Sequence, residues 1–104
     1  MKVENMTSPR TGHSVPNQYV IVETTEIDYI NGIAVYRDVE YFQSYDSIIV
    51  KKIWKGNSWQ VYLDKGTWNY SKTTSKYCNQ FLGETTKETK AKIESGEYIL
   101  TDLN

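Results

Sequence analysis

The residues of this chain best suited to chemistry are the lysines and aromatic side chains of a basic segment, residues 51–80. The segment carries six lysines against one acid, and all three tryptophans lie within it. Lysine ammonium groups neutralise phosphates, and aromatic rings stack on unpaired bases. The segment therefore predicts a surface that binds single-stranded nucleic acid, and its candidate residues are Lys51, Lys52, Trp54, Lys55, Trp68 and Lys72.

The alternative interpretation of these tryptophans is that they form the core of a small sheet. Trp59, Val61 and Leu63 fall at alternate positions, which places them on one apolar face of a strand. For any single tryptophan we weigh the core above a stacking surface. The net charge of −1 also argues against a nucleic-acid-binding domain, because such domains are usually basic as a whole.

A second charged segment, residues 17–50, has the opposite sign. It carries six acids against one arginine. Such a patch can engage a protein partner, a basic one in particular, or a second copy of the chain. The alternative is an ordinary solvated strand face, and we give the two interpretations equal weight. The candidate partner-binding carboxylates are Glu23, Glu26, Asp28, Asp38 and Glu40.

Catalytic and metal-binding side chains are scarce. Cys78 and His13 are the only cysteine and histidine, and nothing in their spacing indicates a nucleophile with its base. One of each cannot supply a zinc site, and no phosphate-binding glycine motif is present. The interpretation we favour is a half-buried thiol and a loop imidazole. We expect no enzymatic activity, no metal and no cofactor.

The elements that would position these residues indicate a single α+β domain over residues 1–104. We expect an antiparallel β-meander of four to six strands, one helix packed across it, and a second, polar helix near the C-terminus. The predicted segments are an irregular N-terminal arm over 1–17, the meander over 18–70, a helical segment over 71–96, and a strand or tail over 97–104.

Local signals define the turns and caps. Asn31-Gly32 predicts a two-residue type I′ hairpin turn, which would set Tyr29 opposite Ala34, Ile27 opposite Tyr36, and Glu26 opposite Arg37. Ser71 or Thr73 can cap the first helix and Gly83 can end it. Thr85 and Glu88 fit a capping box for the second helix.

Several short motifs resemble a family of small proteins of unknown function. They are SPRTG at 8–12, NQY at 17–19, YFQSYDSII at 41–49, WNYSKTTSKY at 68–77 and NQFL at 79–82. Members of that family occur mostly in bacteriophages and other mobile elements of bacteria. The resemblance covers residues 7–19 and 41–82 and carries no established activity.

This chain departs from the family pattern in three places. The acidic hairpin around Asn31-Gly32 is an extension, the polar helix after Gly83 lies outside the shared part, and Cys78 stands where arginine is usual. Within the shared part, residues 43–46 are polar side chains that can line a binding surface, and we pair Arg10 with Asp46.

The resemblance implies a small phage or mobile-element accessory protein. We expect it to bind a host macromolecule in the bacterial cytoplasm, as an inhibitor of a defence system such as a CRISPR nuclease, with the acidic hairpin as decoy for a nucleic-acid channel. The alternatives are a single-stranded nucleic-acid-binding protein and a self-associating assembly protein such as a homodimer. No run of about 18 apolar residues indicates a membrane span.

Overall fold

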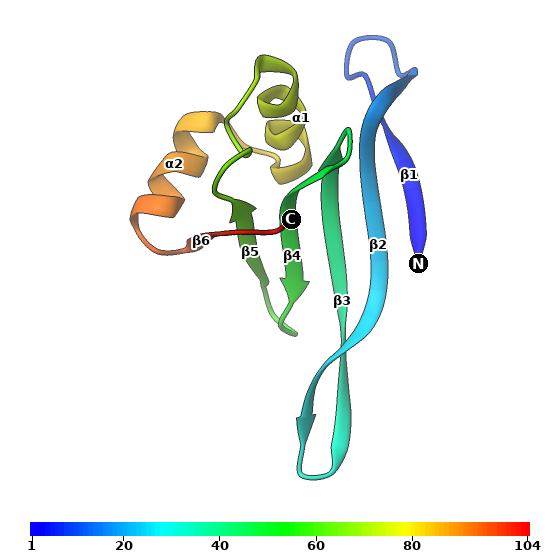
Figure 1. Cartoon of the computed structure of the whole chain (residues 1–104), viewed down its shortest axis with the longest axis vertical. Coiled ribbons are helices and arrows are strands. Elements are labelled where there is room, and N and C mark those ends of the chain that lie inside the picture. The colour runs from blue at the N-terminus through cyan, green and yellow to red at the C-terminus, as the bar shows by residue number, and fades with distance from the viewer.

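A computed structural model describes all residues, 1–104, as one six-stranded sheet with two helices (Figure 1). This arrangement confirms the predicted α+β class. Neither helix is long and apolar enough to cross a lipid bilayer. The strands are β1 (Lys2–Thr7), β2 (Ser14–Ile30), β3 (Ile33–Ser44), β4 (Ser47–Trp54), β5 (Trp59–Asp64) and β6 (Tyr98–Thr101), and the helices are α1 (Lys72–Leu82) and α2 (Thr86–Glu94).

Strand order in the sheet follows chain order, from β1 to β6. Strands β1 to β5 pair antiparallel, but β6 pairs parallel with β5. The sheet is therefore mixed, whereas the sequence predicted antiparallel pairing over 18–70 and no direction for a strand within 97–104. The reason is the connection: α1 and α2 lie between β5 and β6, and a long crossover can return the chain in the same direction, whereas a tight hairpin cannot.

The N-terminal residues form strands, where the sequence predicted an irregular arm over 1–17. Only residues 8–13 form a loop between β1 and β2. Pro16 and Asn17 indicated a loop, but they lie in β2 where its register with β1 shifts. Proline is tolerated at such an irregularity because its missing N–H is not needed for a hydrogen bond between the strands. Asn17 there adopts a φ of 66°.

The β2–β3 turn has the predicted geometry, with positive φ at Asn31 and Gly32. Tyr29 lies opposite Ala34, as predicted. Below that pair a β-bulge at Ile27 shifts the register by one residue. Tyr36 therefore faces Glu26, and Arg37 faces Thr25, so the predicted pairs of Ile27 with Tyr36 and of Glu26 with Arg37 are wrong.

The core lies between α1 and one face of the sheet. Phe42, Val50 and Leu63 are neighbours across β3, β4 and β5, and none has exposed surface. The ring of Phe81 stacks on Phe42 with 5.9 Å between centroids. A bulge in β4 leaves Ile49 unpaired, and it is buried in the same cluster as Val50.

Both helices begin and end as their local sequences predict. The Ser71 hydroxyl accepts a hydrogen bond from the Thr74 backbone N–H at 3.1 Å, so Ser71, and not Thr73, is the N-cap of α1. Gly83 ends α1 in the left-handed conformation, with a φ of 69°. The capping box of Thr85 and Glu88 begins α2.

Two buried side chains are of interest. Cys78 belongs to the core, and burial, with a contribution from Glu84, raises the pKa of its thiol to about 12, so it is a protonated packing group at neutral pH. Gln18 has no exposed surface, and neither its amide nitrogen nor its amide oxygen has a hydrogen-bond partner. An unsatisfied buried amide lowers stability.

We therefore expect Gln18→Met, which keeps the side-chain length and removes both polar atoms, to raise the free energy of unfolding by about 1 kcal/mol. The matched control is Gln43→Met, because the Gln43 amide donates to the Tyr45 carbonyl at 2.7 Å. That variant should lose about 1 kcal/mol. Urea denaturation measures both. A loss of stability in Gln18→Met would mean that bound water satisfies the amide.

Candidate functional site

The β2–β3 hairpin extends beyond the rest of the sheet (Figure 1). Strand β1 pairs with β2 no further than Val22, and β4 pairs with β3 no further than Val39. Residues 23–38 therefore form a two-stranded ribbon, called the ribbon below, whose two outer edges pair with no other strand.

The tip of the ribbon is apolar as well as acidic. Tyr29, Ile30, Ile33 and Tyr36 are each between 50 and 69 % exposed. The charge of this segment gave no indication of these side chains. The sequence does contain an indication of them, because apolar residues lie on both sides of Asn31-Gly32 in a hairpin too long to be covered by its neighbours.

The five predicted carboxylates do not form one patch. Paired residues share a face, so Glu26, Asp38 and Glu40 point to the same side as Phe42, whereas Glu23 points to the opposite side. Asp28 lies beyond the bulge at Ile27.

The five carboxylates also differ in the ion pairs and hydrogen bonds that they form. Glu40 forms an ion pair with Lys52 at 3.8 Å, and Glu23 accepts a hydrogen bond from the Tyr41 hydroxyl at 3.3 Å. Asp38 accepts only from Thr24, on the ribbon itself. Glu26 has no side-chain partner. The carboxylates without an ion pair or a contact outside the ribbon are therefore those of Glu26, Asp28 and Asp38.

The candidate nucleic-acid-binding residues are dispersed. Lys51 and Lys52 are adjacent on β4 and point to opposite faces. The Lys51 ammonium lies 5.9 Å from the Tyr41 ring centroid, and the Lys52 ammonium lies 4.8 Å from that of Trp59. Of the other residues, Trp54 packs edge-on against Trp59, Trp68 packs against the core, and Lys55 and Lys72 are exposed in a turn and on α1.

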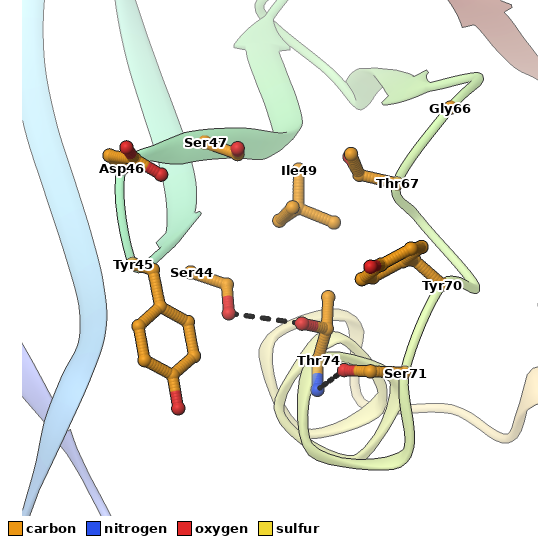
Figure 2. Close-up of a pocket in the computed structure, with 10 residues that line it drawn as sticks. All are labelled: Ser44, Tyr45, Asp46, Ser47, Ile49, Gly66, Thr67, Tyr70, Ser71 and Thr74. Atoms are coloured by element: carbon orange, nitrogen blue, oxygen red, sulfur yellow. Dashed lines mark hydrogen bonds between the residues drawn. The ribbon is translucent and has the colours of Figure 1, made fainter.

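A pocket of about 360 Å³ lies between the β3–β4 turn and the segment that leads from β5 into α1 (Figure 2). Most of its lining comes from residues 41–49 and 68–77, two of the motifs that carry the family resemblance. Residues 43–46 were predicted to line a binding surface, but the residues of the opposite wall were not. The lining residues are Ser44, Tyr45, Asp46, Ser47, Ile49, Gly66, Thr67, Tyr70, Ser71 and Thr74.

The floor of the pocket joins β3 to α1. The hydroxyls of Ser44 and Thr74 form a hydrogen bond of 3.0 Å, and both residues are buried. Figure 2 shows this pair below Ile49, with Thr67 and Tyr70 on one side and the β3–β4 turn on the other. Since Thr74 is also the residue whose N–H meets the Ser71 cap, the start of α1 is held against the sheet at the pocket.

The other wall is a strained two-residue turn. Ser44 pairs with Ser47, so Tyr45 and Asp46 are its central residues. Tyr45 has a φ of 56°, which is uncommon for a bulky side chain. Its N–H donates to the Asn17 carbonyl at 2.7 Å. The Asp46 carboxylate has no ion pair or hydrogen bond, so the predicted pairing with Arg10 is absent.

Asp64 supports the wall formed by Gly66 and Thr67. Its carboxylate accepts from the Thr67 hydroxyl at 2.6 Å and from the Leu103 N–H at 2.9 Å. Burial would raise the pKa of Asp64, but these hydrogen bonds, with others from Asn104 and Gly66, outweigh it and hold the pKa below its usual value. One buried carboxylate thus joins a pocket wall to the C-terminal residues.

No group of three or more histidine, cysteine, aspartate or glutamate side chains lies close enough to hold a metal ion. Cys78 lies on the buried face of α1, in the core, and His13 is exposed in the β1–β2 loop.

Replacing Tyr45 by glycine should relieve the strain of the turn, because glycine adopts positive φ without steric cost. We expect Tyr45→Gly to raise the free energy of unfolding by roughly 0.5 kcal/mol, after allowing for the greater flexibility of glycine in the unfolded chain. The control is Asp46→Gly, at a position without positive φ, which should be destabilising. A loss above about 1 kcal/mol in Tyr45→Gly would mean that ring contacts outweigh the strain.

The Asp64 carboxylate should make stability depend on pH. Because its pKa in the folded protein lies below the usual 3.8, its contribution is complete above that value and is lost as the pH falls through the folded pKa. Asp64→Asn should therefore cost about 2 kcal/mol at pH 7, and this difference should shrink below pH 4. Urea denaturation across this range measures it, and a difference independent of pH would contradict the assignment.

Comparison with known proteins gives a family but no activity. Residues 1–97 match the model of a family of unknown function, DUF8033, so the chain belongs to that family. The match extends beyond the motifs that carried the resemblance and spans both the ribbon and α2. No curated protein and no solved structure matches the chain.

Proposed function

We propose that this member of the DUF8033 family is a binding protein that engages a macromolecular partner through the ribbon, residues 23–38. The observation that carries the proposal is the exposed apolar tip at the end of a protruding hairpin (Figure 1). A small protein gains no stability from extending two strands into water with Tyr and Ile side chains uncovered. Such a patch is typical of an interaction surface.

The residue types at the tip suit a protein partner. Tyrosine supplies a large apolar area with a polar atom at its end, and it is enriched among the residues that dominate binding energy. Tyr29 and Tyr36 flank the turn, and Ile30 and Ile33 form the pair next to it. Tyr29 and Tyr36 lie on one face of the ribbon and the Ile30–Ile33 pair on the other, so a groove that encloses the tip could contact all four side chains.

Charge narrows the class of partner. Asp28 and Asp38 accept single hydrogen bonds within the ribbon, and Glu26 has no side-chain partner. No ion pair neutralises any of these three carboxylates. A partner with a basic groove would gain from meeting them, and attraction of opposite charges would raise the association rate.

A nucleic-acid-binding channel is one such basic groove. The narrower proposal is that the protein is a phage or mobile-element inhibitor of a bacterial defence nuclease, such as a CRISPR nuclease, whose channel the acidic ribbon would occupy. The support for this version is the motif resemblance together with the three unpaired carboxylates, and it extends the broader binding proposal by analogy.

The test measures separately how much the charges of the ribbon and its apolar tip contribute to binding. We expect the triple variant Glu26→Gln, Asp28→Asn, Asp38→Asn to weaken binding to a purified, guide-loaded CRISPR nuclease at least tenfold and to abolish inhibition of DNA cleavage. The variant Tyr29→Ser, Ile33→Ser should also weaken binding, but with little change in its salt dependence, because it removes apolar contacts only.

The control variant carries neutral substitutions at three exposed acids outside the ribbon, Glu94→Gln, Glu97→Gln and Asp102→Asn. It should bind and inhibit as the unchanged protein does. Binding that survives both ribbon variants would overturn the ribbon proposal. Binding that requires the ribbon, but to a partner other than a nuclease, would overturn only the inhibitor version; a photo-crosslinking residue at position 29 identifies that partner.

One observation favours self-association as a second candidate. Both edges of the ribbon have unpaired backbone groups, and such edges can pair with a second copy. Sedimentation at high concentration distinguishes this candidate, since a species that remains monomeric rules it out. The nucleic-acid-binding alternative is weaker, because Lys51 and Lys52 diverge and Trp68 packs against the core.

A further inference from the structure

We propose that the pocket between the β3–β4 turn and α1 binds a cationic group, an ammonium or a guanidinium, carried by a small molecule or by a side chain of a partner. The pocket is distinct from the ribbon, and nothing in the proposed function requires it.

The charge of the lining decides the sign of the ligand. Asp46 is the only acidic residue of the lining, and no lysine, arginine or histidine lines the pocket. Its carboxylate has no ion pair and no hydrogen bond within the chain. The N-terminus of α1 at Ser71 offers an anion a partial positive charge, but this offsets only part of the Asp46 charge, so a phosphate or carboxylate would still be repelled. A cation would form an ion pair with Asp46.

Two tyrosines at the pocket strengthen this preference. Tyr45 and Tyr70 are 57 and 79 % exposed, and in Figure 2 their rings lie on either side of the Ser44–Thr74 pair. The face of an aromatic ring attracts cations, and a ring open to the solvent is free to receive one. The protein already makes contacts of this kind: Lys51 lies over Tyr41.

The floor adds a requirement for a hydrogen-bond acceptor. Ser44 and Thr74 have two hydroxyl protons, and the single bond between them uses one. The other proton has no acceptor within the chain, although both residues are more than nine-tenths buried. A ligand that places a carbonyl or hydroxyl oxygen above this pair would satisfy it.

Hydrogen bonds to β2 and β3 hold the wall formed by the β3–β4 turn in place. The N–H of Tyr45 donates to Asn17, and its carbonyl accepts from Gln43, so β2 and β3 hold a conformation that tyrosine rarely adopts. Strain of this type is concentrated at binding sites. The volume of about 360 Å³ is near the lower end for small-molecule pockets and is large enough for a group the size of an arginine side chain with its backbone amide.

The experiment is a titration of the ¹⁵N-labelled full chain with N-acetyl-arginine amide, followed by amide chemical shifts. This probe has one cation and two carbonyl acceptors. We expect saturable shifts confined to residues 44–49 and 66–74, with a dissociation constant on the order of 1 mM, because the probe has few atoms. N-acetyl-citrulline amide, neutral and of the same length, should give no saturable shifts.

Two variants test the residues. Asp46→Asn should weaken binding of the probe about fivefold, which is the expected contribution of one exposed ion pair. Tyr70→Leu should weaken it by a similar factor, and Glu94→Gln, an exposed acid on α2, should not change it. Shifts outside 44–49 and 66–74 report the fold of each variant. Equal binding of the neutral probe, or an unchanged Asp46→Asn variant, would overturn the proposal.

Titration with a peptide distinguishes a side chain of a partner from a small molecule as the source of the cation. If Gly-Gly-Arg-Gly-Gly binds at least tenfold tighter than N-acetyl-arginine amide, the natural ligand is a side chain of a partner; equal or weaker binding indicates a small molecule. The triple ribbon variant should bind the probe unchanged, so failure of the ribbon proposal and failure of this one are separable.

Discussion

The packing of α1 on the centre of the sheet is the contact on which the rest of this molecule depends. Only eleven hydrophobic residues of 104 are buried, so the apolar core is small. Phe42 is fully buried in this core, and the partly buried ring of Phe81 on α1 stacks on it; such a pair contributes about 1 kcal/mol beyond the burial of its area. Because α1 is anchored there, its first turn meets β3 at Ser44 and Thr74, which creates one wall and the floor of the pocket.

The long β2–β3 hairpin has a covered part and an uncovered part. The end of β2 and β3 near Gln18 and Ser44 lies within the sheet, with β1 and β4 beside it and α1 above it. The other end, beyond Val22 and Val39, has no neighbour. The core thus holds one end of two long strands and leaves the other end to solvent. A binding surface on such a support can reach into a partner without exposing the core.

Local sequence predicted the features that local sequence determines. Ser71, Gly83, and the Thr85–Glu88 pair define helix ends by contacts within one turn, and Asn31-Gly32 defines a hairpin turn by its backbone preferences alone. The bulge at Ile27 and the parallel direction of β6 depend on residues far apart in the chain, so no local pattern indicated them.

The candidate sites show the same limit. The carboxylates and lysines were identified correctly as residue types, but a strand alternates its side chains between two faces, and the register that decides their neighbours is a tertiary property. The sequence indicated one wall of the pocket, because residues 43–46 are polar side chains in a predicted strand. Its other wall is placed by α1 and by the buried Asp64, neither of which the sequence pattern connects to that turn.

The two-stranded ribbon also has a consequence for hydrogen exchange. Its ladder bonds are open to water along both edges, and its side chains contribute little to the core, so it can separate locally at a small fraction of the global free energy of unfolding. Amides between residues 23 and 38 should thus exchange while those of Phe42 and Val50 stay protected. Any partner that binds the ribbon must then order it. Slower exchange of those amides would show which residues the partner protects.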